Sequence, residues 1–230
     1  MYKSSRIGVV IPALDEERAI SRVIADIPGW VDEIVVADNG STDRTAEAAS
    51  RAGVRVVHER ERGYGAACQA GIGALKDTDI VVFLDGDYSD RPSEMAFLVD
   101  PVSKNEADLV VGSRVAGHTE QGALTPQQRF GNWLACRLMR LAWGTAYTDL
   151  GPFRAIRRDA LTSLGMTDRK YGWTVEMQIK AAKAGLRCTE VPVSYRPRIG
   201  TSKISGTLRG SIRAGANILG VIARSALHTR

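Results

Sequence analysis

Short, continuously apolar runs alternate with amphipathic segments along the first half of the chain. The apolar runs predict strands at residues 7–11, 34–37, 54–57, 80–84 and 109–112. Apolar residues with helical spacing predict helices over residues 17–27, from Ser41 or Thr42 to about residue 52, and over residues 64–75. Such strands, separated by helices, are typical of a parallel sheet covered on both faces. Right-handed crossovers then bring the carboxyl ends of the strands to one edge, where open α/β sheets bind ligands.

The second half of the chain has a different pattern. It predicts helices over residues 126–143, 173–184 and 207–226, strands at 153–156 and 187–195, and a loop at 198–206. Gly185 is expected to end the middle helix. Pro192 predicts that its strand lies at an edge of the sheet, because proline cannot donate a hydrogen bond to a neighbouring strand.

Charge is unevenly distributed along the sequence. The net charge of +5 divides into −7 over residues 1–100 (11 basic, 18 acidic), +5 over 101–186 (12 and 7) and +7 over 187–230 (8 and 1). An acidic front half suits a metal site, whereas a basic rear half suits a phosphate-bearing or membrane-surface partner. A solvated basic tail is the alternative. Nucleic acid is not expected as a partner, because the basic residues are not interleaved with aromatic ones.

Cysteine usage and the lengths of the apolar runs indicate the compartment. Cys68, Cys136 and Cys188 have neither CxxC spacing nor a paired pattern, which predicts buried thiols in a reducing environment. No apolar stretch reaches the roughly 18 residues needed to span a bilayer, and no signal peptide precedes the first strand. We therefore expect a cytoplasmic protein.

Four loops with unusual polar content follow predicted strands, at residues 12–17, 37–43, 62–67 and 85–90. In the last of them, Asp85 and Asp87 are spaced i and i+2, which puts both carboxylates on one face of an extended backbone. Two such carboxylates repel each other unless a divalent cation that prefers oxygen ligands binds them. Gly86 between them leaves room for a phosphate near the backbone. A polar turn with solvated aspartates is the alternative.

The other loops carry weaker signals. Glu16 and Asp38 suit base N–H groups or ribose hydroxyls, but a helix cap is the alternative for each, and residues 41–43 have the composition of capping residues. The glycines at 63 and 65 match neither G-x-G-x-x-G nor a Walker loop. Taken singly, these loops identify no ligand.

The order of the motifs resembles a known family. V-V-I-P-A-L-D-E-E, V-V-A-D-N-G-S-T-D-R-T, G-Y-G-A-A-x-x-x-G and F-L-D-G-D resemble the family-2 inverting glycosyltransferases of the GT-A fold. The rear motifs T-D-L-G-P-F-R-A-I, G-W-T-V-E-M-Q and R-I-G-T-S-K are similar to the polyprenyl-phosphate branch, which includes dolichol-phosphate mannose synthases. The resemblance covers about residues 7–206. It implies a single α/β domain of the GT-A fold over residues 1–230, with a mostly parallel central sheet. Within this domain, residues 1–115 would bind the nucleotide sugar, residues 116–206 would form the acceptor side, and residues 207–230 would form a C-terminal helix.

The resemblance also implies roles for individual residues. Binding of the nucleotide sugar falls to Pro12, Ala13, Glu16, Asp38, Gly65, Asp85, Gly86 and Arg114. Asp85 and Asp87 would hold Mg²⁺ or Mn²⁺, and Arg198 and Lys203 would contact phosphates or the acceptor. Catalytic roles fall to Asp149, Arg154 and Glu176. Leu14, Asn39 and Ser89 depart from the family pattern, so the donor stays open between a GDP-hexose and a UDP-hexose.

The implied reaction is an inverting displacement at the anomeric carbon, in which a metal neutralises the leaving diphosphate. A lipid phosphate acceptor is already ionised and requires no strong base. A hydroxyl of a soluble or polysaccharide acceptor would require one, with Asp149 or Glu176 as the candidates. For Glu176 an ion pair on the helix surface is the alternative. A nucleotide-sugar-binding protein without catalysis remains a third hypothesis.

A polyprenyl phosphate acceptor implies contact with a membrane surface, and hence peripheral association. The candidate membrane-facing residues are Trp133, Leu134, Arg137, Leu138, Met139, Arg140 and Trp143. Packing of this face on the sheet or on a second subunit of a homo-oligomer is the alternative, and it is favoured for the leucines.

Overall fold

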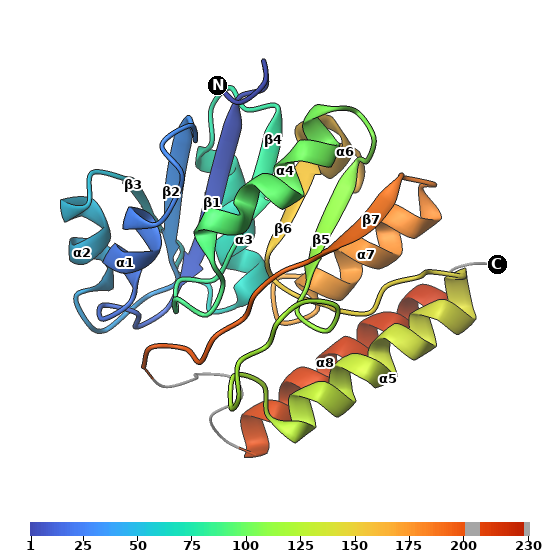
Figure 1. Cartoon of the computed structure of the whole chain (residues 1–230). Coiled ribbons are helices and arrows are strands. Elements are labelled where there is room, and N and C mark those ends of the chain that lie inside the picture. Colours follow the sequence, from blue (N-terminus) through green and yellow to red (C-terminus); the bar gives the residue numbers. More distant parts are fainter. Residues whose placement is uncertain (201–207, 228–230) are drawn as a thin grey trace.

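The computed structural model describes residues 1–200 and 208–227, with side chains placed in 1–200 and 214–227. Seven strands form one sheet in the order β3-β2-β1-β4-β6-β5-β7. They are β1 (Ile7–Ala13), β2 (Glu33–Asp38), β3 (Arg55–His58), β4 (Ile80–Phe83), β5 (Leu109–Ser113), β6 (Arg154–Arg157) and β7 (Cys188–Pro192). Figure 1 shows this sheet with helices on both faces.

The sheet is mostly parallel, as the apolar runs predict. β6 runs antiparallel to both of its neighbours, β4 and β5, and every other strand pair is parallel. The register sets Ala13 opposite Asp38 and Val10 opposite Phe83, so β1, β2 and β4 end at the same edge. The loops that follow these strands therefore meet.

The helices form two layers. They are α1 (Ile20–Ala25), α2 (Thr45–Arg51), α3 (Tyr64–Ala74), α4 (Met95–Ser103), α5 (Pro126–Trp143), α6 (Arg158–Ser163), α7 (Trp173–Lys183) and α8 (Leu208–Leu227), with a short 3₁₀ turn at Pro92–Glu94. Alternate residues of β1 face opposite cores. Val9 and Ile11 pack with residues of α1 and α4, whereas Val10 packs with residues of α3, α5 and α7. Both faces of the sheet are thus buried.

Most predicted elements are confirmed within a few residues. The edge position predicted from Pro192 is confirmed, because β7 is the last strand of the sheet. Three details differ. The first helix begins at Ile20 rather than residue 17, and α4 and α6 were not predicted. Helix α2 begins at Thr45, and its N-cap residue, Arg44, forms no side-chain cap, so the prediction that Ser41 or Thr42 caps this helix is wrong. The thiols predicted to be unpaired are free, with Cys68 and Cys136 buried.

Helix α5 has well-defined ends. Thr125 and Gln128 form a reciprocal capping box at its start, and Gly144 ends it in the left-handed conformation with φ 67°. α5 packs beside α8, and both lie beyond the carboxyl ends of the strands on the β5 and β7 side (Figure 1). Among the described residues, no helix is long and apolar enough to cross a membrane.

Candidate active site

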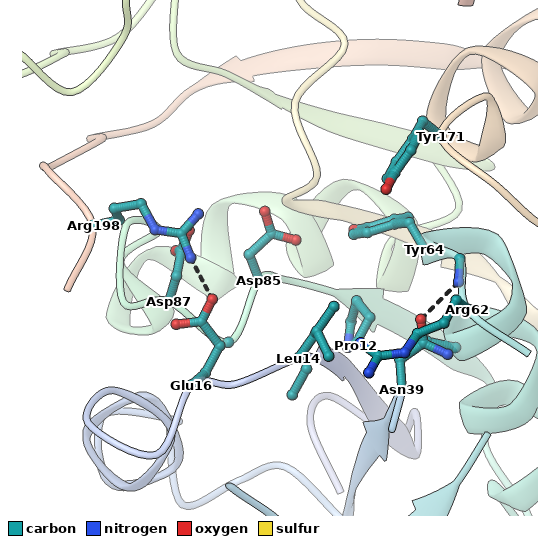
Figure 2. Close-up of a pocket in the computed structure, with 14 residues that line it drawn as sticks. Pro12, Leu14, Glu16, Asn39, Arg62, Tyr64, Asp85, Asp87, Tyr171 and Arg198 are labelled. Atoms are coloured by element: carbon teal, nitrogen blue, oxygen red, sulfur yellow. Dashed lines mark hydrogen bonds and ion pairs between the residues drawn. The ribbon is translucent and has the colours of Figure 1, made fainter. Parts of the chain in front are cut away.

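The loops at the carboxyl edge of the sheet enclose a cavity of about 360 Å³. The described residues that line it are Pro12, Ala13, Leu14, Glu16, Asn39, Arg62, Gly63, Tyr64, Ala67, Asp85, Gly86, Asp87, Tyr171 and Arg198. Figure 2 shows Glu16, Asp87 and Arg198 at one end, Asn39, Arg62 and Tyr64 at the other, and Asp85 between them. The cavity therefore has an ionic end and an end with amide and aromatic groups.

The loop after β4 concentrates buried carboxylates. Asp87 is 6% exposed, and its Oδ1 accepts hydrogen bonds from Ser89 N at 2.9 Å and Ser89 Oγ at 2.5 Å. Asp85 Oδ1 is buried without a hydrogen-bond partner in the part of the chain that the structure describes, and the hydroxyl of Tyr64 points toward this carboxylate in Figure 2. Burial and the charge of Asp87 raise the pKa of Asp85 to about 7. The loop thus stores unfavourable negative charge that a cation would relieve.

A third carboxylate, Asp90, lies in the same loop and was not among the predicted site residues. It is 1% exposed, its Oδ2 accepts from the amide of Asp85 at 3.2 Å, and its Oδ1 has no partner among the described residues. Burial, together with the charges of Asp85 and Asp87, raises the pKa of Asp90 well above its usual value. The position of Asp90 therefore disfavours its charged form and adds to the negative charge that the loop concentrates.

Arg198 supplies the positive charge nearest to these acids. Its Nη1 lies 3.3 Å from Asp87 Oδ2, and its Nη2 pairs with Glu16 Oε1 (Figure 2). The backbone fixes this position, because Ile199 N donates to Asp87 O at 2.9 Å and Arg196 N donates to Ser89 O at 3.0 Å. The segment that carries Arg198 is thereby attached along the acid loop.

Glu16 is buried beside this ion pair. Glu16 is 8% exposed, and burial raises its pKa to about 7. The charge of Arg198 lowers this pKa, whereas the charges of Asp87 and Asp85 raise it further. The backbone amide of Glu16 donates to Thr45 Oγ1 at 2.7 Å. The amides of Asp15 and Glu17 likewise donate to Ser41 Oγ and Asp43 Oδ2. The side chains of Ser41, Asp43 and Thr45 therefore hold the Glu16 loop in place, and Asp43 Oδ1 also accepts from the amide of Thr45, the first residue of α2, at 2.9 Å.

The opposite end of the cavity depends on Asn39. Its Oδ1 accepts from Gly63 N at 2.7 Å, and its Nδ2 donates to the carbonyls of Glu59 and Glu61 at 3.2 and 2.7 Å. These bonds fix the loop that carries Arg62 and Tyr64. Neighbouring Asp38 is 4% exposed and does not line the cavity, because it accepts from Ser41 N at 3.2 Å and lies 3.1 Å from His58 Nδ1.

Gly65 is in tight contact with the backbone of another segment. A Cβ built there would overlap the carbonyl oxygen of Asp168, and Gly65 N donates to Lys170 O at 3.0 Å. Gly65 does not line the cavity, whereas Gly63 does. Gly86 lines it with its backbone, and a Cβ on Gly86 would reach ordinary contact with Ala13 at 3.4 Å.

Asp149 and Arg114 form a buried ion pair beside the cavity. Asp149 is 0% exposed, and its two oxygens accept from the Nε and Nη2 of Arg114 at 2.8 and 2.7 Å. The amide of Arg114 donates to the same carboxylate at 2.8 Å. Burial opposes the charge of Arg114, yet Asp149 raises the pKa of Arg114 above its usual value. Neither residue lines the cavity.

Glu176 and Arg154, also predicted to be catalytic, bind their own surroundings. Glu176 accepts from the amides of Thr167 and Asp168 at 3.0 and 2.8 Å and pairs with Lys180 at 2.8 Å, and these bonds outweigh burial and lower its pKa. Arg154, 0% exposed, donates to the carbonyls of Leu150, Gly151 and Thr174. Neither side chain lines the cavity. Lys203 lies outside the described residues.

The acid loop fits a divalent cation that is shared with a phosphorylated ligand. Asp85 Oδ1 lacks a partner, and Asp87 Oδ2 has Arg198 as its recorded ion-pair partner. In the part of the chain that the structure describes, no three His, Cys, Asp or Glu side chains are arranged to hold a metal by themselves. Phosphate oxygens and water would have to complete the coordination sphere, as is usual for Mg²⁺.

Several cavity residues were missed from sequence. Asn39 and Tyr64 lie inside quoted motifs, where Asn39 was noted as a departure from the family pattern and Tyr64 stood between two glycines. Leu14 also lies inside a quoted motif, as a departure from the family pattern, and Arg62 directly precedes the glycine motif. Tyr171 lies between predicted elements, and no local pattern marks it.

Comparisons with known proteins give a consistent result. A family model described as glycosyl transferase family 2 matches residues 8–165. The chain is 42% identical over 212 residues to an uncharacterized glycosyltransferase of Mycobacterium tuberculosis, covering 90% of this chain and 94% of that protein. It is 32% identical over 224 residues to the dolichyl-phosphate hexose transferase of Haloferax volcanii, covering 96% and 95%.

The structure is also similar to a solved one. Glucosyl-3-phosphoglycerate synthase from Mycobacterium tuberculosis, crystallised with Mn²⁺, uridine-diphosphate-glucose and phosphoglyceric acid, superposes with a TM-score of 0.79 and 26% sequence identity. The match covers 97% of this chain and 80% of that one.

Proposed function

The chain belongs to glycosyl transferase family 2 and has the GT-A fold, and on that premise we propose that it transfers a hexose from a GDP- or UDP-sugar to a polyprenyl phosphate with inversion at the anomeric carbon. That it is a glycosyltransferase follows from the family. The donor, the metal and the acceptor are the proposal, and each draws on a different part of the site.

The two ends of the cavity suit the two ends of a nucleotide sugar. Asn39, Arg62 and Tyr64 offer polar and aromatic groups to a nucleoside. Asp85 and Asp87 would hold Mg²⁺ or Mn²⁺ under the diphosphate at the other end, and this cation would neutralise charge on the leaving group. Crystals of the M. tuberculosis synthase contain Mn²⁺ with uridine-diphosphate-glucose, which supports this arrangement.

Arg198 has a second role in this proposal. Once a cation occupies the acid loop, Asp87 no longer needs the guanidinium as its counter-charge. The guanidinium can then donate to phosphate oxygens, where it stabilises the charge that builds up as the diphosphate leaves. We propose that Lys203 assists from the same segment.

One observation supports a phosphate acceptor in particular. Both predicted bases, Asp149 and Glu176, are bound to other groups and lie outside the cavity lining. A lipid phosphate needs no base, because its attacking oxygen is already ionised. The dolichyl-phosphate hexose transferase of H. volcanii, 32% identical over nearly the whole chain, supports the lipid. Asp149 then acts by positioning Arg114, and Glu176 by fixing the 167–168 turn.

A soluble phosphorylated acceptor is the second candidate. It is favoured by the likeness to the synthase that was crystallised with phosphoglyceric acid.

The two acceptors separate in one experiment. The protein is incubated with Mn²⁺ and radiolabelled GDP-mannose or UDP-glucose, with either undecaprenyl phosphate in detergent or 3-phosphoglycerate, and the products are extracted into organic solvent. Label in the organic phase, lost in Asp87→Asn, is the expected result. Label confined to the aqueous phase, in an acceptor-dependent product, would replace the lipid with the soluble acceptor. No transfer from any sugar nucleotide would refute the donor assignment.

A further inference from the structure

The outward side of α5 carries an unusual combination of exposed side chains. The α5 face consists of Arg129, Phe130, Trp133, Arg137, Arg140 and Leu141. Spacings of three, four and seven residues place all six on one stripe of the helix. Phe130, Trp133 and Leu141 are 62%, 57% and 73% exposed, although large apolar side chains are normally buried. Met139, on the opposite side of α5, is fully buried, so that side of the helix packs against the core.

The arginines of this face have no counter-charges. Arg129, Arg137 and Arg140 form no side-chain hydrogen bond or ion pair with any residue that the structure describes. Several arginines elsewhere are paired with carboxylates, as at Arg114, Arg157, Arg169, Arg187 and Arg198. By sequence, α5 and the adjacent α8 together contain six arginines and no Asp or Glu. Among the described residues, no carboxylate pairs with the three arginines of the α5 face.

A groove lies between this face and Arg114. It has a volume of about 660 Å³, and Arg129, Trp133, Arg137 and Arg140 line one side of it. Arg114 also lines this groove, and Asp149 holds its guanidinium with Nε 2.8 Å from Oδ2. α5 itself lies beyond the same sheet edge that carries the cavity (Figure 1). A ligand held on the α5 face would thus reach Arg114 through this groove.

We propose that the α5 face docks the protein onto a bilayer rich in anionic phospholipid. The aromatic side chains and Leu141 would enter the boundary between head groups and acyl chains, and the three arginines would contact lipid phosphates. The docked surface would present a lipid acceptor to the groove, and in this respect the inference rests on the proposed function.

A second copy of the chain fits this face less well. A symmetric dimer built on α5 would bring the arginines of one copy against those of the other, with no acidic residue on either helix to offset them. Anionic lipid provides the missing negative charge, and it also accepts the exposed aromatic rings.

Vesicle binding of the full-length protein tests the proposal. Wild-type protein is sedimented with sucrose-loaded vesicles of phosphatidylcholine, or of phosphatidylcholine and phosphatidylglycerol in equal parts, without polyprenyl phosphate or sugar nucleotide. Binding is expected on the anionic vesicles and should weaken as salt is added. The triple variant Arg129→Gln/Arg137→Gln/Arg140→Gln should bind about 100-fold more weakly, since each basic residue near an anionic surface contributes about fivefold.

A matched control removes the same charge elsewhere. Arg18, Arg22 and Arg60 are exposed and lie on the α1 and β3 side of the sheet, so their triple Gln variant should retain wild-type binding. The double variant Phe130→Ser/Trp133→Ser should bind the anionic vesicles about tenfold or more weakly, because less apolar area enters the boundary between head groups and acyl chains. Thermal melts confirm that each variant is folded.

Three results would overturn the proposal: no binding of wild type to anionic vesicles, equal losses in the two triple variants, or a wild-type dimer that Phe130→Ser/Trp133→Ser dissociates. Because the vesicles contain no acceptor and no donor, failure here leaves the transfer reaction standing. Failure of transfer likewise leaves the docking result intact.

Discussion

Arg198 and Asp87 form an ion pair at the ionic end of the cavity, with 3.3 Å between Nη1 and Oδ2. The pair joins two segments that are far apart in sequence, and backbone hydrogen bonds from the Arg198 segment to the acid loop reinforce it. Because Asp87 is also the proposed metal ligand, the guanidinium and a divalent cation compete for the same carboxylate.

This competition predicts opposite effects of Arg198→Gln on two measurements. Without nucleotide, the variant should bind Mn²⁺ several-fold more tightly, because the carboxylate has lost its internal counter-ion. With donor and acceptor, transfer should fall by about 100-fold, because one donor to the leaving diphosphate is gone. Electron paramagnetic resonance of free Mn²⁺ measures the first effect and radiolabel transfer the second. Arg18→Gln, at an exposed position, is the control, and weaker Mn²⁺ binding in Arg198→Gln would contradict the competition.

Glu16 predicts a specific dependence of stability on pH. Burial raises its folded pKa to about 7, above the value of about 4.3 expected in the unfolded chain. Between these values the folded protein holds a proton that the unfolded chain has released, so the contribution of this group to stability is present below about pH 4 and is lost as pH rises toward 7. Glu16→Gln should therefore gain stability relative to wild type over this range, on the order of 1 kcal/mol.

Urea unfolding of both proteins in EDTA at several pH values measures this difference. Subtracting wild type from Glu16→Gln at each pH cancels the groups that the two proteins share. A difference that stays constant or shrinks from pH 4 to 7 would show that Arg198 outweighs burial.

The buried pair of Asp149 and Arg114 predicts a structural cost. Asp149→Asn leaves the Arg114 charge in the interior with a neutral partner, so the free energy of unfolding should fall by about 3 kcal/mol. The matched control is Asp159→Asn, which breaks the exposed pair with Arg157 and should cost less than about 1 kcal/mol. Adding Arg114→Gln to Asp149→Asn should recover part of the loss, because the unpaired charge is then gone.

The kinetics of Asp149→Asn separate positioning from base catalysis. If Asp149 positions Arg114, the transfer rate of Asp149→Asn should fall, while both limbs of the pH–rate profile remain. If Asp149 were the base for a hydroxyl acceptor, the rate would fall by about 100-fold or more and the acidic limb of its pH profile would disappear.

How far sequence predicted this molecule depends on how local each signal is. Strands and long helices follow from periodicity, and Pro192 alone placed β7 at the edge, because the missing amide is a property of one residue. The acid pair was found for a similar reason, since both residues lie within one loop. By contrast, α6 and Tyr171 were missed, because neither is marked by a local pattern.

Side-chain orientation accounts for the remaining differences. Ser41 and Asp43 have the composition of caps, yet they accept hydrogen bonds from the Glu16 loop, a partner that only the β1–β2 register brings near. Asp38 and Asn39 are adjacent in sequence, but Asn39 alone reaches the cavity. Motif position therefore predicted loops that line the cavity and did not determine which of their side chains face it.

Two of the three glycines of α3, Gly65 and Gly73, offer a test of packing against ligand binding. A Cβ at Gly65 would overlap the carbonyl oxygen of Asp168, whereas a Cβ at Gly73 would meet nothing within 4 Å. Gly65→Ala should therefore destabilise the protein by about 2 kcal/mol, a typical cost of overpacking. Gly73→Ala should stabilise it by about 0.5–1 kcal/mol, through helix propensity alone. Chemical denaturation measures both, and unchanged stability in Gly65→Ala with weakened donor binding would instead assign Gly65 to the nucleotide sugar.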